Sequence, residues 1–283
     1  MLQLLTETWE ARRARTATLE QRHPFAAEVL RLYAALLPVQ EEAFDDATTA
    51  PPAPGRIAAH VAERVAPRIA EATAAAGPKR LVAEIADCLA RSSAQAIVAG
   101  WMFGDEQAPA ERYLARSSLS PVLEAMGQDA APAFHGRGDR RHCPRCGGPP
   151  QLSCFKRATD DLASGGRVLV CARCHCEWGY PRMTCSGCGE QSSSRLPVYS
   201  EVGTAAGERG GVVRGLGVPA ETDALFPHVR IEACETCRRY LLNIDVAADP
   251  QAVPLVDELA ALPLDLYARD LGFTKITPNL MGF

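Results

Sequence analysis

The sequence predicts an α+β protein of several domains, with an all-α helical bundle first and small metal-binding modules after it. Two observations lead to this prediction. Apolar residues recur at helical spacing up to about residue 103, and no strand-like alternation stands out before residue 130. After residue 143, four Cys-x-x-Cys pairs alternate with short segments of β type. At 283 residues, the chain is long enough for two domains with separate cores.

Residues 1–130 are expected to form the helical bundle. We predict a short exposed helix over 5–20, and a second helix that begins at Phe25 and ends in the Pro-rich segment 45–55. Further helices are predicted over 57–75, 81–103 and 121–126. The 81–103 helix is the most apolar, with these inward-facing candidates: Leu81, Ile85, Leu89, Ile97 and Trp101. Cys88 on this helix is interpreted as a core thiol, and His60 as a surface or packed residue.

Residues 131–142 are predicted to be a linker, because Gly, Pro and charged residues dominate and no period is visible. A basic run from Arg137 to Arg145 lies beside the first cysteine pair. We interpret this run as a solvated hinge, with contact to an acidic partner as the alternative.

The four Cys-x-x-Cys pairs are the strongest functional signal in the chain. Two thiolates separated by two residues can face one cation, and two such pairs complete a tetrahedral four-sulfur site. The sequence therefore predicts two metal ions, and soft thiolates accept either iron or zinc. Pairing in sequence order closes the shortest loops, whereas joining the second pair to the third is the main alternative. The candidate ligands are Cys143, Cys146, Cys171, Cys174, Cys185, Cys188, Cys234 and Cys237.

Glycines follow two of the pairs, at Gly147 and Gly189. The chain turns sharply after the second cysteine of a metal-binding knuckle, and glycine tolerates the positive φ of that turn. His175 and Arg238 follow the other two pairs, so we expect less regular knuckles there.

The cysteine pairs and β segments together predict two rubredoxin-like or zinc-ribbon modules, at 143–182 and 183–250, in which bound metal supplies folding free energy on the order of 10 kcal/mol per site. Residues 251–283 are predicted to hold a C-terminal helix, Val253–Leu271, and a tail; Leu255, Leu259, Leu262 and Leu266 mark the helix's apolar face. The predicted strands are Gln151–Phe155, Arg167–Val170, Arg195–Tyr199, Val229–Ala233 and Leu241–Val246.

Charge is nearly balanced, with 30 Lys+Arg against 34 Asp+Glu, which disfavours a broad nucleic-acid footprint. No signal peptide and no uncharged run of membrane length is visible, so we expect a cytoplasmic protein without membrane insertion. In that reducing compartment, cysteines bind metal and are not crosslinked.

Two alternative functions remain open from the residues alone. One is a zinc-ribbon protein that binds nucleic acid and uses its metal only structurally. The other is a thiol enzyme that uses Cys154 or Cys176. Since no cysteine pair precedes a convincing helix whose N-terminus would lower a thiol pKa, we expect no enzyme and no catalytic residue.

Several segments with their flanks resemble one known family. They are Cys143–Pro150, Gly166–Cys174, Glu177–Trp178, Arg182–Gly189, Glu232–Leu241 and Leu262–Tyr267. Together they resemble the FdhE family of formate dehydrogenase accessory proteins over about residues 140–273.

The resemblance implies a cytoplasmic, non-enzymatic protein that binds the catalytic subunit of a respiratory formate dehydrogenase through a scaffold with rubredoxin-like iron sites. Candidate contact surfaces are the turns Pro149–Pro150 and Trp178–Tyr180 and the basic run Arg137–Arg145. The family usually has Gly-Thr where this chain has His175-Cys176, which adds a further thiol beside the second pair.

Overall fold

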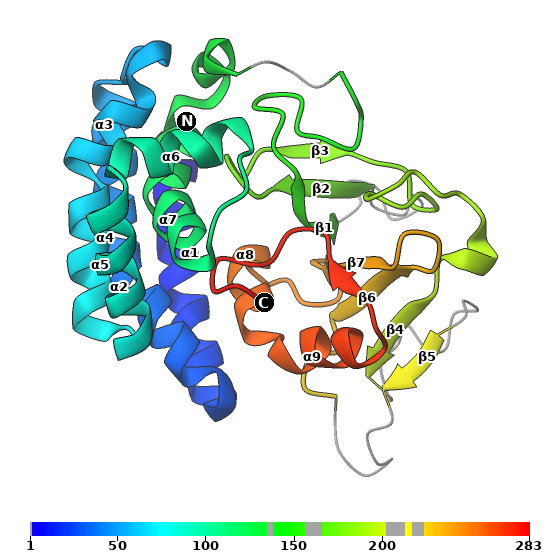
Figure 1. Cartoon of the computed structure of the whole chain (residues 1–283). Coiled ribbons are helices and arrows are strands. Elements are labelled where there is room, and N and C mark those ends of the chain that lie inside the picture. The colour runs from blue at the N-terminus through cyan, green and yellow to red at the C-terminus, as the bar shows by residue number, and fades with distance from the viewer. Residues whose placement is uncertain (1, 135–137, 157–165, 202–212, 217–223) are drawn as a thin grey trace.

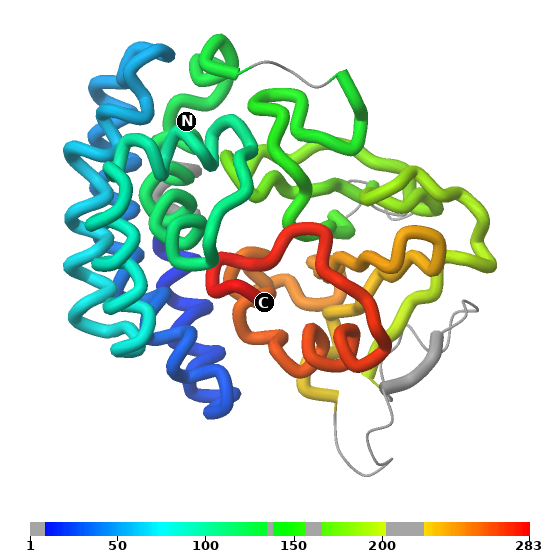
Figure 2. Tube along the Cα trace, viewed as in Figure 1, coloured from blue at the N-terminus to red at the C-terminus, as the bar shows by residue number. Residues whose placement is uncertain are grey.

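The protein consists of a helical layer and a mixed β-sheet that pack side by side (Figure 1). The structure is a computed structural model that describes residues 2–134, 138–156, 166–201, 213–216 and 224–283. The chain passes from the helical layer through the sheet, and its C-terminal segment returns to the middle of the molecule (Figure 2). The predicted α+β class, with the helical part first, is confirmed.

Seven α-helices make up the described part of the N-terminal layer, and the second of them packs against both the first and the last. A 3-10 helix, Gly127–Ala133, follows the last α-helix and occupies the beginning of the predicted linker. The helices are α1 (Leu2–Arg22), α2 (Ala27–Thr49), α3 (Ile57–Arg64), α4 (Ala66–Ala76), α5 (Lys79–Arg91), α6 (Ala94–Phe103) and α7 (Pro109–Met126).

Two helices that the sequence predicts as continuous are each broken in two. The 57–75 helix breaks at Val65, because Pro67 in the first turn of α4 has no N–H to donate and its ring crowds the preceding turn. The 81–103 helix breaks at Ser92-Ser93, and the Ser93 side chain accepts a hydrogen bond from Ala96 N at 3.2 Å, which caps α6.

Three further helix predictions are wrong in detail. The first helix is not simply exposed, since Trp9 and Leu19 on α1 are buried in the core. Leu89 is 39 % exposed and does not face inward. The predicted short helix at 121–126 is the end of α7, an 18-residue helix that continues through Pro121.

The strands form one sheet in the order β3-β2-β1-β7-β6-β4-β5, with β8 also paired to β7. Four of the five predicted strands match within about two residues, while the one placed at 195–199 begins at Val198. The strands are β1 (Pro150–Phe155), β2 (Arg167–Cys171), β3 (Glu177–Gly179), β4 (Val198–Glu201), β5 (Val213–Leu216), β6 (Val229–Cys234), β7 (Arg239–Asp245) and β8 (Thr274–Lys275).

One strand pairing joins the two cysteine-containing regions. Strand β1 runs parallel to β7, with Ser153 opposite Asn243 and Phe155 opposite Asp245. The strands that flank the first two cysteine pairs and those that flank the last two therefore share a sheet. The division into modules at residue 182 stays a prediction, and the two regions are hydrogen-bonded to each other wherever that boundary is drawn.

The C-terminal helix is also two helices, α8 (Pro254–Ala260) and α9 (Leu262–Asp270), with Pro263 in the first turn of the second. Helix α8 contacts α1 and α2 on one side and β1 and β7 on the other, so it fills the space between the layers. Leu259 is buried there, whereas Leu266 on α9 is 49 % exposed, contrary to its predicted place on an apolar face.

Candidate metal centres

The first and second cysteine pairs bring four sulfurs together. The Sγ atoms of Cys143, Cys146, Cys171 and Cys174 all lie within 4.8 Å of one another. Neighbouring sulfurs are 3.4 Å apart (Cys146 to Cys174), 3.5 Å (Cys146 to Cys171) and 3.6 Å (Cys143 to Cys174). A tetrahedral metal with bonds of about 2.3 Å to sulfur separates its ligands by about 3.8 Å. The first tetracysteine site therefore fits a zinc or iron ion with only a slight expansion.

The third and fourth pairs form a second tetracysteine site of the same kind, with Cys185, Cys188, Cys234 and Cys237 within 4.8 Å. The Sγ distances are 3.7 Å both between Cys185 and Cys237 and between Cys188 and Cys234. All eleven cysteines of the chain are free thiols. The four pairs thus associate in sequence order, as loop length predicts, and the alternative grouping of the second pair with the third is wrong.

All four knuckles make the same backbone turn after their second cysteine. Gly147 and Gly189 have φ of 64° and 85°, and the non-glycine residues His175 and Arg238 have φ of 51° and 56°. The expectation of less regular knuckles at His175 and Arg238 is therefore wrong. Since a positive φ costs a non-glycine residue about 1–2 kcal/mol, the four-sulfur arrangement imposes this turn on side chains that disfavour it.

Backbone groups support the sulfurs closely. In the first site Arg173 N donates to Cys171 Sγ at 3.3 Å, and in the second Gly187 N donates to Cys185 Sγ at 3.3 Å. A Cβ at Gly148 would lie 2.8 Å from Cys171 Sγ, so only glycine lets the backbone pass this sulfur. Such N–H donors favour the thiolate form that binds metal.

The first site is buried at the junction of the two layers. Its four cysteines are 0–2 % exposed and belong to the same apolar cluster as residues of α2 to α7. Arg173 joins the site to the helical layer, because its Nε donates to Trp101 O at 3.1 Å and its Nη1 to Cys146 O at 2.9 Å. Desolvation raises the pKa of the Cys171 thiol, so four thiolates can be accommodated here only with a compensating cation.

The second site lies toward the surface. Cys185 and Cys234 are buried, but Cys237 is half-buried and Cys188 is exposed. None of the four cysteines of the second site belongs to either of the two large apolar clusters. Ile276 of the C-terminal segment lies next to Gly187, between the two cysteines of the third pair. The two sites therefore have the same ligands but different access to solvent.

The remaining cysteines lie outside the two four-sulfur groups. Cys154 is a fully buried residue of β1, and burial raises the pKa of its thiol, as it does for Cys88 on α5. The position of Cys88 agrees with its interpretation as a core thiol, and Cys154 is packed in the same way. Cys176 is half-buried beside the first site, where its thiol interacts with the sulfurs of Cys143 and Cys174. A thiol enzyme that uses Cys154 lacks substrate access.

The predicted contact turns are only partly available. Pro150 begins β1 and is buried, and Tyr180 is buried with its hydroxyl donating to Cys185 O at 3.1 Å. Within the basic run, Arg137 lies outside the described residues. Arg141 donates to Asp139, which lowers the pKa of that carboxyl to about 2, and also to Gly187 O at 3.1 Å. Arg141 thus connects the run to the second site, so this part is not a freely solvated hinge.

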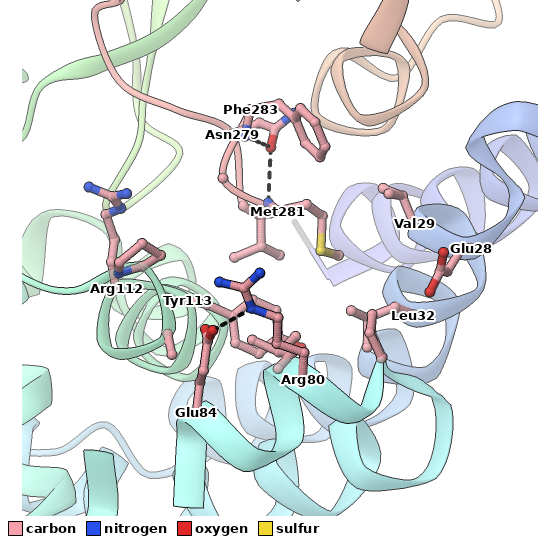
Figure 3. Close-up of a pocket in the computed structure, with 16 residues that line it drawn as sticks. Glu28, Val29, Leu32, Arg80, Glu84, Arg112, Tyr113, Asn279, Met281 and Phe283 are labelled. Carbon is pink, nitrogen blue, oxygen red and sulfur yellow. Dashed lines mark hydrogen bonds and ion pairs between the residues drawn. The ribbon is translucent and has the colours of Figure 1, made fainter. Parts of the chain in front are cut away.

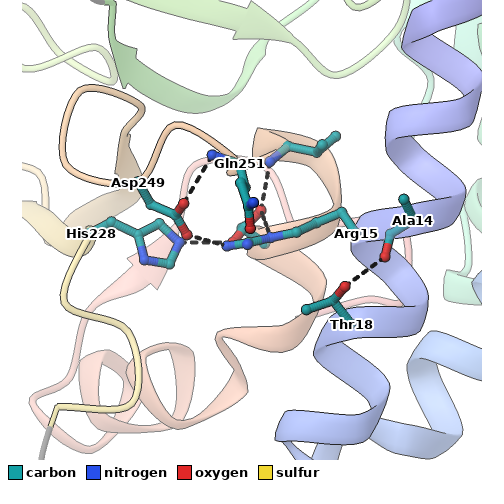
Figure 4. Close-up of polar contacts among 8 residues, drawn as sticks. Ala14, Arg15, Thr18, His228, Asp249 and Gln251 are labelled. Carbon is teal, nitrogen blue, oxygen red and sulfur yellow. Dashed lines mark hydrogen bonds and ion pairs between the residues drawn. The ribbon is translucent and has the colours of Figure 1, made fainter.

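A third group of possible ligands consists of His228, Asp249 and Asp257. Figure 4 shows Arg15 of α1 pointing into this group, where its Nη2 lies 2.7 Å from Asp249 Oδ2 and its Nε 3.0 Å from Asp257 Oδ2. His228 Nε2 lies 2.7 Å from Asp257 Oδ1. The guanidinium already supplies the cation that the two carboxylates need, so we interpret the group as a buried ion-pair network between the layers.

A groove of about 350 Å³ lies between α2, α5, α7 and the C-terminal segment (Figure 3). Its walls include Leu32, Leu81 and Met281, and Arg80 pairs with Glu84 at its edge. No cysteine or histidine lines it. No local sequence pattern indicates this groove, because its wall is completed by residues about 200 positions apart.

The fold and the two sulfur clusters define a class: an α+β protein in which a helical layer and a single sheet hold two tetracysteine metal-binding clusters. A model of the family described as "FdhE, C-terminal domain" matches residues 217–281. The C-terminal part of the chain is thus similar to the FdhE family.

Individual relatives show the same similarity. A "Protein FdhE homolog" of Aquifex aeolicus is 30% identical over 172 residues, which are 61% of this chain and 52% of that protein. A homologue from Pseudomonas aeruginosa is 34% identical over 142 residues, or 50% of this chain and 40% of that one. The chain thus spans about half the length of the curated relatives it matches.

A solved structure extends the comparison. The crystal structure of the FdhE protein from Pseudomonas aeruginosa superposes with a TM-score of 0.62 at 25% identity, covering 96% of this chain and 94% of that one. Among the described residues, no helix combines the length and apolar character needed to cross a membrane.

Proposed function

We propose that this protein is a non-enzymatic accessory factor that acts in the cytoplasm, binds the catalytic subunit of a formate dehydrogenase and is needed for the activity of that enzyme. The observation that carries the proposal is the pair of four-sulfur clusters on the scaffold of the FdhE family. The geometry accounts for a protein built to hold two metal ions, and the pocket that the described residues form beside the second cluster has a volume of only about 70 Å³.

The eight clustered cysteines are the proposed ligands, four to each metal ion, and iron is the proposed metal. A tetrathiolate iron can change its charge by one unit, whereas zinc has no accessible redox step. The distances between sulfurs suit both metals, so the preference for iron comes from the family resemblance. The basic run gives the alternative of a nucleic-acid-binding ribbon less support than its sequence suggests, since Arg141 is paired with Asp139.

The test is anaerobic purification followed by elemental analysis, a visible spectrum and capture of the purified catalytic subunit. We expect about two metal ions per chain and a red colour that bleaches on reduction. A colourless protein filled with zinc would remove the redox role but leave the scaffold. Failure of the metal-replete protein to bind the catalytic subunit would contradict the proposal itself.

A matched pair of variants connects metal to function. The double change Cys143→Ser and Cys146→Ser removes two sulfurs from the first site, so we expect the loss of one metal ion and weaker binding of the catalytic subunit. Cys88→Ser removes a buried thiol of α5 that belongs to neither cluster, so metal content and binding should both be retained. Full metal content in the double variant would disprove the ligand assignment.

A further inference from the structure

A small pocket adjoins the second tetracysteine site. It has a volume of about 70 Å³, and Cys185 and Ser186 of the third knuckle form part of its wall. The other walls come from the start of β2, the segment before Cys185, the segment leading into β4, and the strands β6 and β7. The charged lining residues are Arg167, Arg182, Glu232 and Arg239.

Among the described residues that line the pocket, three arginines face one glutamate. Glu232 is already engaged, since it pairs with Arg167 and accepts a hydrogen bond from Ser153 Oγ at 2.8 Å. Arg182 and Arg239 are exposed at the mouth, with the Arg182 guanidinium 4.6 Å from the centre of the Phe155 ring. Like charges gathered around a small concavity raise the local concentration of anions.

A buried donor in the wall also points to a missing acceptor. The Arg167 side chain is 3 % exposed, and its Nη1 donates to Pro181 O at 3.0 Å and to Thr184 O at 3.2 Å. These bonds hold the guanidinium in a fixed position. Its Nε is buried and has no hydrogen-bond partner among the described residues. Buried polar atoms without a partner are uncommon in folded proteins, so this one calls for an explanation.

The rim of the pocket is apolar. Met183 is 54 % exposed, and Leu196 and Val198 are half-buried beside it. An exposed methionine next to a charged pocket is suited to adaptable contact with a partner's side chains. A free inorganic anion would use only the arginines, whereas a peptide with acidic and apolar residues would use both features.

We propose that this pocket and its rim bind an acidic segment of a partner protein, with a carboxylate side chain seated among Arg167, Arg182 and Arg239. The inference rests on the proposed accessory role, and it adds the place and chemistry of contact. The segment 182–186 and the β6–β7 hairpin face each other across the pocket. Cys185 and the following Cys188 lie on the first side, and Cys234 and Cys237 lie on the second, so the second site joins the two sides. Partner binding therefore requires an intact second site.

The first experiment uses a fluorescein-labelled peptide of alternating glutamate and leucine, titrated with the full-length, metal-bound protein while anisotropy is recorded. The double variant Arg182→Gln/Arg239→Gln should bind at least tenfold more weakly than the unmodified protein. The control, Arg56→Gln/Arg64→Gln, removes the same charge from exposed positions of the helical layer and should change affinity by less than twofold. Metal content is measured for each variant to verify that the clusters are intact.

Equal binding by the two double variants would overturn the proposal. It would also be overturned if inorganic phosphate or a single-stranded oligonucleotide bound the unmodified protein more tightly than the peptide and displaced it. Binding of the purified catalytic subunit separates this inference from the proposed function. If Arg182→Gln/Arg239→Gln still captures the subunit normally, the pocket is wrong and the accessory role stands. If the unmodified protein binds the peptide but never the subunit, the accessory role is wrong.

Discussion

Replacing Asp257 by asparagine should destabilise the fold strongly, because the change leaves a buried arginine with too little negative charge. Arg15 is 4 % exposed, and Asp257 is fully buried and contributes both carboxylate oxygens to the guanidinium. Burial by itself would lower the pKa of Arg15, but Asp257 and Asp249 outweigh it and raise that pKa. The arginine is therefore charged in the folded protein and depends on these two carboxylates.

The magnitude follows from burial. Removing one partner of a buried ion pair costs about 3–5 kcal/mol. Asp249 remains in Asp257→Asn and still contacts Arg15 at 2.7 Å, although it is 25% exposed, so we expect the low end, about 3 kcal/mol. For a chain of this size that corresponds to a decrease in Tm of about 6–10 °C. Asparagine can still accept the hydrogen bond from Val253 N, so the start of α8 is kept.

Differential scanning fluorimetry provides the assay, with Glu20→Gln as the matched control. That change breaks the exposed pair between Glu20 and Arg31 and should lower Tm by roughly 1–2 °C at most. The double variant Arg15→Met/Asp257→Asn should recover part of the loss, since it no longer buries an unmatched charge. A decrease for Asp257→Asn no larger than the control's would refute the reasoning. So would a rise in Tm with Mn²⁺ that disappears in Asp257→Asn, because it would show a cation site instead of an ion pair.

Three further predictions concern the metal sites and pH. A water-soluble chelator should remove one metal ion per chain at least tenfold faster than the other, because Cys188 of the second site is exposed; release in a single phase, followed by native mass spectrometry, would contradict this. Gly148→Ala should lose one metal ion, since its Cβ would lie 2.8 Å from a sulfur, whereas Gly189→Ala has open space and should keep both ions at a cost of about 1–2 kcal/mol in φ strain. Burial would raise the pKa of Glu124, but Arg12 and His175 lower it to about 2. The ionised Glu124 therefore contributes about 3 kcal/mol to the free energy of unfolding above pH 4.5, and this contribution is lost as pH falls toward 2. The difference in urea stability between the unmodified protein and Glu124→Gln should therefore be constant near neutral pH and shrink below pH 4.5; a difference that does not depend on pH would show that the charge of Glu124 is irrelevant.

The cysteine clusters could be predicted from sequence because their signal is local. Two residues between sulfurs fix each pair, and the lengths of the connecting segments favour pairing in sequence order. The strands β1, β2, β6 and β7 could be predicted for the same reason, because each of them lies directly before or after a cysteine pair. The positive φ of His175 and Arg238 could not be predicted, because neither residue type favours that conformation. The closure of the four-sulfur site imposes it.

The features that sequence reasoning missed depend on contacts between distant residues. Arg15 and Asp257 are separated by 242 positions, and no local pattern marks either as buried. The pairing of β1 with β7 likewise joins residues about 90 positions apart, so the predicted modules could not be recognised as parts of one sheet. Breaks within helices were readable in principle, since Pro67 and the Ser92-Ser93 sequence are known stop and start signals.

The difference in burial between the two sites assigns them different physical roles. The first site lies inside the apolar cluster that joins the helical layer to the sheet, and Arg173 ties it to the backbone of α6. Loss of metal from the first site would disturb this apolar cluster, so the first site contributes to the stability of the whole molecule. The second site holds a surface segment whose arginines and methionine form the proposed contact for a partner. Under the proposed contact, a change of metal or of charge at the second site can therefore alter partner affinity without unfolding the protein.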